Sequence, residues 1–203
     1  MRRDNIELCE ELGIDILGFV VEYPRKVPWN LTREQAKALL AVARQPTCIV
    51  TGGVAEKVIA LAKELNPNMV QLHFKETATQ TLEIAAELKK SGIKTIKAVA
   101  DASEIEALCQ TDIGAILVDS RTSENSATNT QTIDAELFNR IKMKSSKPLI
   151  IAGGITPDNV GSIIARTGAD WIDVMTGVEH SSGVKDRTKI ELLVRRVSAC
   201  AGR

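Results

Sequence analysis

Short apolar runs alternate along the chain with longer segments in which apolar residues recur at helical spacing. Seven of these runs have strand length, are rich in β-branched residues and alternate little, as expected for strands that are covered on both faces. They span residues 14–21, 47–51, 68–72, 95–99, 115–118, 148–152 and 171–174. Strands that alternate with helices predict an α/β fold with a parallel sheet.

The segments between these runs predict seven amphipathic helices. They span residues 33–43, 55–65, 79–90, 104–108, 135–142, 158–166 and 187–199. Thr32 and Thr156 stand at the N-cap positions of two helices, and Pro157 fits a first helical position, where its missing N–H leaves no helix hydrogen bond unmade.

The number of strands and the first predicted element bear on the choice of fold. The chain opens on a helix-like stretch, residues 3–12, and then supplies seven strands, whereas a TIM-type (β/α)8 barrel closes with eight strand–helix units. We therefore expect an α/β barrel of this type whose first strand is missing from the chain. A seven-stranded open sheet of the doubly wound type is the alternative. No linker or low-complexity tract divides the sequence, so residues 1–203 are expected to form one domain.

Charge and cysteine content exclude several classes of protein. Lys plus Arg and Asp plus Glu each number 26, so no net field recruits nucleic acid or an anionic membrane. Without a signal peptide or a long apolar run, the protein is expected in the cytoplasm. The four cysteines are scattered, and we expect them to be small buried hydrophobes. Two histidines without matched acidic ligands indicate no metal centre.

Two loops that carry glycine follow the last two predicted strands. Gly153 and Gly154 stand between a buried strand and a capped helix, where backbone N–H groups can approach an anion and the helix start adds partial positive charge. Thr176 and Gly177 follow the next strand. In TIM-type barrels a phosphate often binds between these two loops, so we predict a phosphate site there. The alternative is that the glycines serve tight turns only.

Polar side chains stand at the ends of two other predicted strands. Asp119 follows the run 115–118, and His73 follows Val-Gln-Leu on an earlier strand. The carboxyl ends of barrel strands face the ligand, so Asp119 can serve as a general acid or base; the alternative is a carboxylate that binds loop backbone. His73 is expected either at the ligand or in support of a neighbouring side chain. The polar stretch 120–132 is expected on the same face.

Six segments together resemble the phosphoribosylanthranilate isomerases. They are residues 13–20 (GIDILGFV), 70–73 (VQLH), 116–119 (ILVD), 151–160 (IAGGITPDNV), 173–179 (DVMTGVE) and 183–186 (GVKD), in the order of that family and at nearly its spacing. Any one motif is weak, but six in order over almost the whole chain are specific.

The resemblance implies an Amadori rearrangement in tryptophan biosynthesis. N-(5-phosphoribosyl)anthranilate becomes 1-(2-carboxyphenylamino)-1-deoxyribulose 5-phosphate, with no metal or organic cofactor. The implied partner is this small phosphoribosyl substrate, and the implied assembly is a monomer or a homodimer. Asp119 matches the family's general acid, which acts on the oxygen of the ribose ring.

The resemblance also assigns the binding residues. Asp173 matches a residue near the substrate's hydroxyl groups, and His73 is expected with it on the substrate side. The residues that match the family's phosphate-binding groups are Gly153, Gly154, Thr176 and Gly177.

Three departures from the family pattern bear on activity. The family carries a Lys-Ile-Cys-Gly motif on its first strand, and that cysteine removes the C2 proton from the iminium intermediate; this sequence begins just after the place of the motif. The loops 25–31 and 120–132 differ from the family's Arg-Tyr-(Ile/Val)-Ser and Gly-Gly-Thr-Gly-Lys runs. The usual Leu-His-Gly reads Leu72-His73-Phe74.

Two explanations of the missing motif stay open. In the favoured one, Met1 is an internal methionine, and the strand with its cysteine lies upstream. In the other, the chain starts here, leaves strand edges unpaired and lacks its base. The isomerase is the leading functional hypothesis. A divergent barrel enzyme acting on another phosphorylated sugar or aromatic amine is the second, and a catalytically inactive phosphosugar-binding protein is the third.

Overall fold

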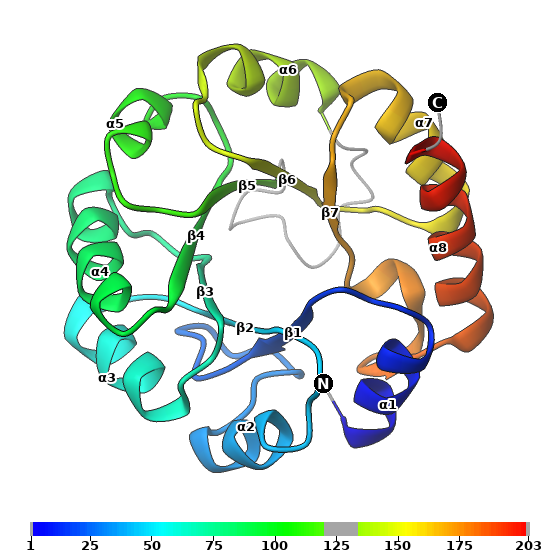
Figure 1. The fold of residues 1–203 in the computed structure, drawn as a ribbon, viewed down its shortest axis with the longest axis horizontal. Coiled ribbons are helices and arrows are strands. Elements are labelled where there is room, and N and C mark those ends of the chain that lie inside the picture. The colour runs from blue at the N-terminus through cyan, green and yellow to red at the C-terminus, as the bar shows by residue number, and fades with distance from the viewer. Residues whose placement is uncertain (1, 120–133, 202–203) are drawn as a thin grey trace.

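Seven parallel strands form a curled sheet at the centre of the molecule, with helices around it (Figure 1). The computed structural model describes residues 2–119 and 134–201. The strands are β1 (Leu17–Val20), β2 (Thr47–Thr51), β3 (Met69–Leu72), β4 (Lys94–Val99), β5 (Ala115–Asp119), β6 (Leu149–Ala152) and β7 (Trp171–Asp173). Each strand pairs with the next one along the chain. Because this order contains no switch point, the doubly wound alternative is wrong.

The helices form a ring outside the sheet. They are α1 (Arg3–Glu11), α2 (Arg33–Leu40), α3 (Ala55–Leu65), α4 (Ala78–Lys90), α5 (Ile105–Cys109), α6 (Ala135–Lys144), α7 (Pro157–Thr167) and α8 (Arg187–Ala201). Thr32 caps α2 as predicted, since its hydroxyl accepts from the N–H of Gln35 (3.3 Å). Thr156 is the N-cap residue of α7, with Pro157 in the first helical position.

Most predicted element ends moved by only a few residues. Two ends moved by three residues: α2 ends at Leu40 rather than at residue 43, and β1 begins at Leu17 rather than at residue 14. Residues 14–16 form the connection that follows the turn after α1, where Gly13 has a φ of +75°. The polar stretch 120–132 lies outside the described residues.

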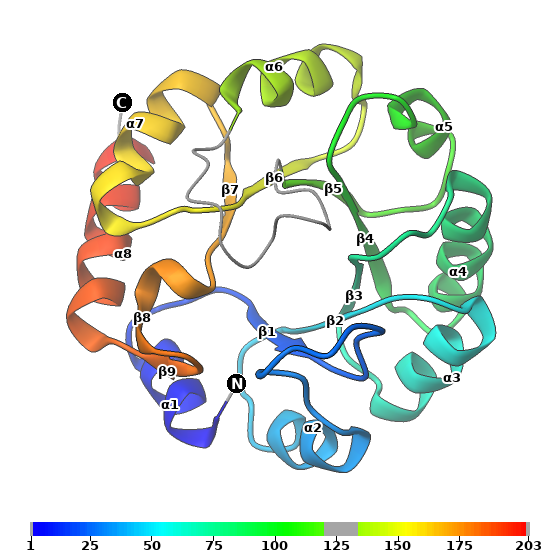
Figure 2. The same ribbon diagram turned by 180° about the vertical axis from the view of Figure 1, so that it is seen from behind.

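The arrangement is that of a (β/α)8-type barrel with one strand fewer, as predicted. Within the described residues, β1 and β7 are the two ends of the sheet and do not pair with each other. α1 precedes β1 and lies in the ring between α2 and α8 (Figure 2). Arg187 of α8 forms an ion pair with Glu11 of α1. The first described helix therefore occupies the position of a barrel helix.

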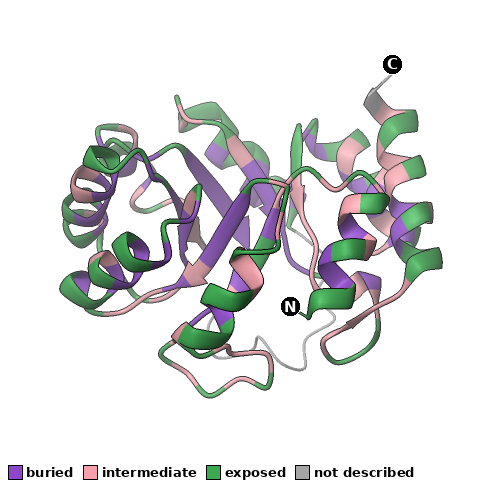
Figure 3. Ribbon diagram, turned by 60° about the horizontal axis from the view of Figure 1, so that its bottom comes forward, coloured by how far each residue is buried: buried purple, intermediate pink, exposed green. Residues whose placement is uncertain are grey.

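Side chains of each strand alternate between the barrel interior and the layer beneath the helices. In Figure 3 most residues of β2 to β6 are buried, and the helices are exposed on their outer faces. The interior holds the smaller apolar cluster, made of Cys48, Ile96, Ala115, Leu117, Ile150 and Ala152. By alternation from Leu117, the side chain of Asp119 also points inward. Asp173 is in register with Ala152, so it belongs to the same inner face.

A short hairpin follows β7, and the apolar periodicity did not predict it. The turn η1 (Thr176–Val178) leads into β8 (Glu179–Ser181), which pairs antiparallel with β9 (Val184–Lys185). The side chain of Asn5 in α1 donates to the carbonyl of Gly183 (2.8 Å) and accepts from the N–H of Lys185 (3.1 Å). The hairpin therefore ties the loop after β7 to the start of α1.

Candidate functional site

Asp119 ends β5 on the inner face of the barrel, and only 4% of its side chain is exposed. Nε2 of His73 lies 3.7 Å from its Oδ2. His73 follows β3, and its Nδ1 lies 3.0 Å from Nε2 of Gln71 on the same strand. The structure thus brings the predicted acid and the predicted histidine together, with an amide that orients the imidazole.

Asp173 ends β7 at the same level of the barrel. Asp119 is in register with Ala152 on β6, and Ala152 is in register with Asp173. The two carboxylates are therefore separated by one strand, with a small alanine side chain between them. Parallel strands end at one edge of the sheet, which explains how residues 54 positions apart in sequence reach one site.

The loop after β6 runs through two glycines with positive φ angles. Gly153 has a φ of +98° and Gly154 a φ of +62°, a backbone region that residues with a Cβ rarely adopt. Asn159 in the first turn of α7 donates to the carbonyl of Gly154 (2.9 Å) and accepts from the N–H of Thr156 (2.8 Å). This bracing directs the loop into the N-terminus of α7, where the helix dipole favours an anion.

The loop after β7 lies directly against the loop after β6. A Cβ at Gly177 would stand 1.8 Å from the carbonyl oxygen of Ile155, so only glycine allows this approach. Thr176, beside it, is exposed at the same place. The four residues predicted for phosphate binding therefore lie on two loops in contact.

Tyr23, Arg25 and Phe74 form a group of side chains next to His73, called the aromatic corner below. The rings of Tyr23 and Phe74 meet edge to face, with centroids 6.0 Å apart. The guanidinium of Arg25 lies over the Phe74 ring, 5.7 Å from its centroid. This is a cation–π arrangement, and it places a positive charge next to an aromatic face.

The loop after β1 holds the aromatic corner in place. The side chain of Asn30 accepts from the N–H of Tyr23 (2.9 Å) and donates to its carbonyl (3.1 Å). The Tyr23 hydroxyl in turn donates to the backbone carbonyl of His73 (2.6 Å). The sequence does not show that Tyr23, Arg25 and Phe74 belong together, because the contacts that unite them join loops that are about 50 residues apart.

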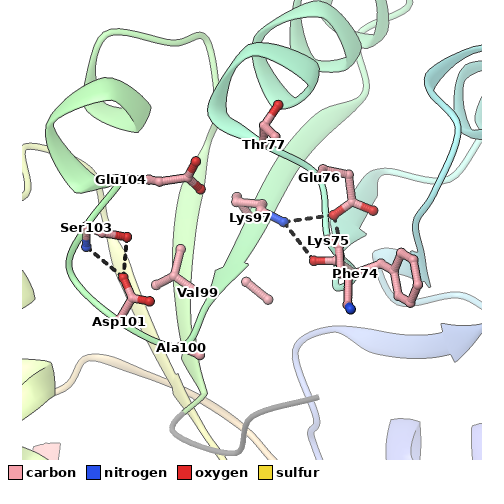
Figure 4. A pocket seen from close by; sticks show the side chains of 11 residues that line it. Phe74, Lys75, Glu76, Thr77, Lys97, Val99, Ala100, Asp101, Ser103 and Glu104 are labelled. Carbon is pink, nitrogen blue, oxygen red and sulfur yellow. Dashed lines mark hydrogen bonds and ion pairs between the residues drawn. The ribbon is translucent and has the colours of Figure 1, made fainter. Parts of the chain in front are cut away.

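A cavity of about 250 Å³ opens between the loops after β3 and β4. Figure 4 shows its lining, with Lys97 pointing to Glu76 on one side and Asp101 bound to Ser103 on the other. The glycine loops do not line this cavity. It borders the aromatic corner, since Phe74 belongs to both.

None of the four cysteines stands at the carboxyl end of a strand. Burial raises the pKa of the Cys48 thiol inside the barrel, and the Asp173 carboxylate raises it further. Burial also raises the pKa of Cys9 in α1. Burial opposes ionisation at Cys109 as well, but hydrogen bonds from Ser146 and its neighbours lower its pKa overall. Cys9 and Cys48 are buried as expected, whereas Cys109 and Cys200 are only partly buried.

The chain matches one protein-family model over most of its length. The model describes N-(5'-phosphoribosyl)anthranilate isomerases and matches residues 23–196. The chain belongs to the phosphoribosylanthranilate isomerase family. This confirms the family that the six sequence motifs indicated.

Curated relatives of the phosphoribosylanthranilate isomerase family match almost the whole chain. One is the N-(5'-phosphoribosyl)anthranilate isomerase of Pseudomonas putida, 33% identical over 92% of this chain and 88% of its own length. Another is the same enzyme of Haloferax volcanii, 28% identical over 98% of this chain and 90% of its own length.

Solved structures of phosphoribosylanthranilate isomerases share the fold. The enzyme from Thermotoga maritima superposes with a TM-score of 0.82 at 26% identity, over 98% of this chain and 95% of that one. A second structure, with a TM-score of 0.78 at 25% identity over 98% and 94% of the chains, contains reduced 1-(o-carboxyphenylamino)-1-deoxyribulose 5-phosphate. A third is described as monomers made from the dimeric Thermotoga maritima enzyme.

The described residues of this family member show neither a membrane-spanning helix nor a metal-binding group. In residues 2–119 and 134–201, no helix is both long and apolar enough to cross a bilayer. In the same ranges, no three His, Cys, Asp or Glu side chains come together as a metal-binding group.

Proposed function

We propose that this protein catalyses the Amadori rearrangement of N-(5-phosphoribosyl)anthranilate, an aldose–ketose isomerisation in tryptophan biosynthesis. The observation that carries the proposal is the buried Asp119 carboxylate, which faces the barrel mouth beside His73. A carboxylic acid there can protonate the ring oxygen of ribose as the C1–O bond opens. Membership of the family supports the same reaction.

Phosphate binding is proposed at the two loops in contact. Gly153 and Gly154 bring backbone N–H groups close to the start of α7, and Thr176 with Gly177 closes the other side. A phosphate there would lie at the ends of β6 and β7, at most one strand from Asp173 on β7 and at most two from Asp119 on β5. The ribose would therefore lie across the inner carboxylates. Asp173 is proposed to bind the ribose hydroxyls.

The aromatic corner is proposed to take the anthranilate end of the substrate. Anthranilate is a flat ring that carries a carboxylate. Phe74 offers a ring face, and Arg25 offers a guanidinium next to it. Guanidinium groups bind carboxylates in fixed two-point geometry, so Arg25 can recognise this group.

The cysteines favour a second candidate, a phosphosugar-binding protein without turnover. Removal of the C2 proton needs a base, and a buried thiol with a raised pKa such as Cys48 is a poor one. In the family pattern the base stands on the strand that precedes α1. A chain that lacks this strand would therefore bind the phosphosugar without turning it over.

Complementation of a tryptophan auxotroph that lacks the isomerase tests both candidates. Three genes are compared: the chain as printed, the chain with an upstream strand that carries the cysteine, and the extended chain with Asp119→Asn. Growth with the extended chain and none with its Asp119→Asn variant supports the isomerase. Absence of growth from a well-expressed extended chain contradicts it. Binding of the reduced product analogue without growth then supports the second candidate.

A monomer or a homodimer acting in the cytoplasm is proposed for this enzyme. The solved structure of a relative from Thermotoga maritima is described as monomers generated from a dimeric isomerase. Sedimentation of the purified chain, together with cell fractionation, tests these two points.

A further inference from the structure

A buried pair of opposite charges lies beside the proposed site and has no part in the chemistry described so far. Nζ of Lys97, on β4, is 2.8 Å from Oε2 of Glu76, in the loop after β3 (Figure 4). Their side chains are 3% and 0% exposed. Burying two charges is costly, and apolar residues of similar size are often as stable in such a place. Stability alone therefore does not account for this pair.

Both members of the pair hold the backbone of Phe74. The Glu76 carboxylate accepts from the N–H of Phe74 (3.2 Å), and the Lys97 ammonium donates to its carbonyl (3.2 Å). Hydrogen bonds in which one partner is ionised are stronger than those between neutral groups. The two charges thus fix the peptide groups on either side of the Phe74 ring.

The backbone of His73 is held just as completely. Its N–H donates to the carbonyl of Thr51 (3.0 Å), and its carbonyl accepts from the Tyr23 hydroxyl (2.6 Å). Each backbone polar group of the dipeptide His73-Phe74 therefore has a partner. Three of these partners belong to other segments, and Glu76 stands two residues further along the same loop. This anchoring limits the positions that the imidazole of His73 and the ring of Phe74 can take.

The loop after β2 has the shape that admits the Glu76 carboxylate. Oε1 of Glu76 accepts from the N–H of Gly53 (2.7 Å). A Cβ at Gly52 would stand 2.3 Å from this oxygen and 2.5 Å from Cβ of Phe74. Gly53 has a φ of +103°, which favours glycine. The two glycines and the ion pair form one unit that joins the loops after β2 and β3 to strand β4.

We infer that Glu76 and Lys97 are positioning residues for the isomerisation. Through the backbone of Phe74 they hold His73 at 3.7 Å from the Asp119 carboxylate and the Phe74 ring beside the Arg25 guanidinium, and neither has a role of its own in the proposed chemistry. The inference rests on the proposed function, in which Asp119 is the acid and Phe74 faces the aromatic ring. Small displacements of such groups reduce rates strongly, because the reacting atoms lose their alignment.

Replacing both charges together separates positioning from stability. The test uses the chain with the upstream strand. There, Glu76→Met with Lys97→Met leaves no unpaired buried charge, but it removes the partners of the Gly53 and Phe74 N–H groups and of the Phe74 carbonyl. The double variant is therefore expected to fold with a moderately lower unfolding temperature than the parent. Its kcat is expected to fall at least tenfold, with a smaller change in KM. The matched control removes Lys63 and Glu87, an exposed pair between α3 and α4, and leaves kcat unchanged. Parental kcat in the folded double variant would overturn the inference.

A second measurement does not depend on turnover. The chain has only two histidines, so the imidazole NMR signals of His73 can be told apart from those of the exposed His180. Asp119→Asn is expected to move the His73 signals in the parent, and to move them much less in the double variant. An equal response in both overturns the positioning role. Should the double variant not fold, Glu76→Gln is compared in the same way.

The two measurements keep the inference and the proposed function apart. If Asp119→Asn moves the His73 signals only when the ion pair is present, the positioning role stands. Absence of turnover in the parent would then count against the isomerase and leave the positioning role in place.

Discussion

The carbonyl oxygen of Ile155 occupies the space that a side chain at Gly177 would need. A Cβ there would lie 1.8 Å from this oxygen and 2.9 Å from the carbonyl carbon, so the obstacle is backbone and cannot rotate away. The loops after β6 and β7 can therefore lie in contact only while residue 177 is glycine.

Gly177→Ala is expected to push these two loops apart and to weaken phosphate binding. The dissociation constant of the reduced product analogue, measured by calorimetry, should rise at least tenfold. The control is Gly161→Ala in α7, where a Cβ meets nothing within 4 Å. That control should keep its affinity and gain about 0.5–1 kcal/mol of stability, because alanine favours the helix. Unchanged affinity in Gly177→Ala would argue against the proposed phosphate site.

Asp119→Asn is expected to lower kcat by about 10²–10⁴-fold, the usual contribution of a general acid. The amide keeps the size of the buried side chain, so the melting temperature should change little. Turnover is measured by the fluorescence of the anthranilate group. Asp112→Asn, an exposed aspartate that pairs with Lys89, serves as the control. Parental kcat in Asp119→Asn would remove this residue from the mechanism.

Arg25→Met is expected to weaken binding of ligands that carry the benzoate group. Loss of a hydrogen bond to a charged group corresponds to about 10–100-fold in affinity. A product analogue without the carboxyl group should bind the parent and Arg25→Met equally well. Lys26→Met, the neighbouring exposed cation, should change neither affinity. If the two analogues lose the same affinity, Arg25 does not recognise the carboxylate.

Cys48 is expected to make the protein less stable in alkali. Burial raises the pKa of this thiol above its ordinary value of 9.0, and Asp173 adds to the effect. Above pH 9 the thiol ionises in the unfolded chain while the folded chain keeps it protonated, so stability falls by up to about 1.4 kcal/mol per pH unit. Below pH 9 the thiol is protonated in both the folded and the unfolded chain, so Cys48 does not change the free energy of unfolding with pH there.

Urea unfolding of the parent and Cys48→Ala between pH 8 and pH 10.5 measures this effect. The difference in unfolding free energy between the two proteins should narrow as the pH rises, whereas Cys200→Ser should follow the parent. A constant difference would mean that the Cys48 thiol ionises equally in both states.

Periodicity predicted every strand of the sheet because buried parallel strands are continuous apolar runs. It missed the hairpin β8–β9, whose polar residues carry no such pattern. It also made β1 three residues too long at its start, because Ile14 and Ile16 resemble strand residues although they lie in the connection between α1 and β1. The choice between barrel and open sheet needed the strand order, which depends on contacts between distant segments.

The candidate site also contains residues that the sequence predicted and residues that only the structure shows. Asp119, His73 and the glycine loops were recognisable because they follow strands directly, and the ends of parallel strands share one edge. Arg25, Glu76 and Lys97 were not, because each acts through a loop or strand far away in sequence. A charge in a loop is usually solvated, and nothing local distinguishes Glu76 from Lys75 beside it.

By itself, the sequence determined the parallel α/β architecture, the family and the strand-end residues, since these depend on local periodicity and on short motifs. Only the tertiary structure decided that the loops after β6 and β7 touch at Gly177, and that Glu76 and Lys97 meet in the interior. The physical reason is that these contacts join segments far apart in the sequence. Their distance in space depends on the curvature of the sheet and on the packing of each loop, and no single stretch of residues determines either property.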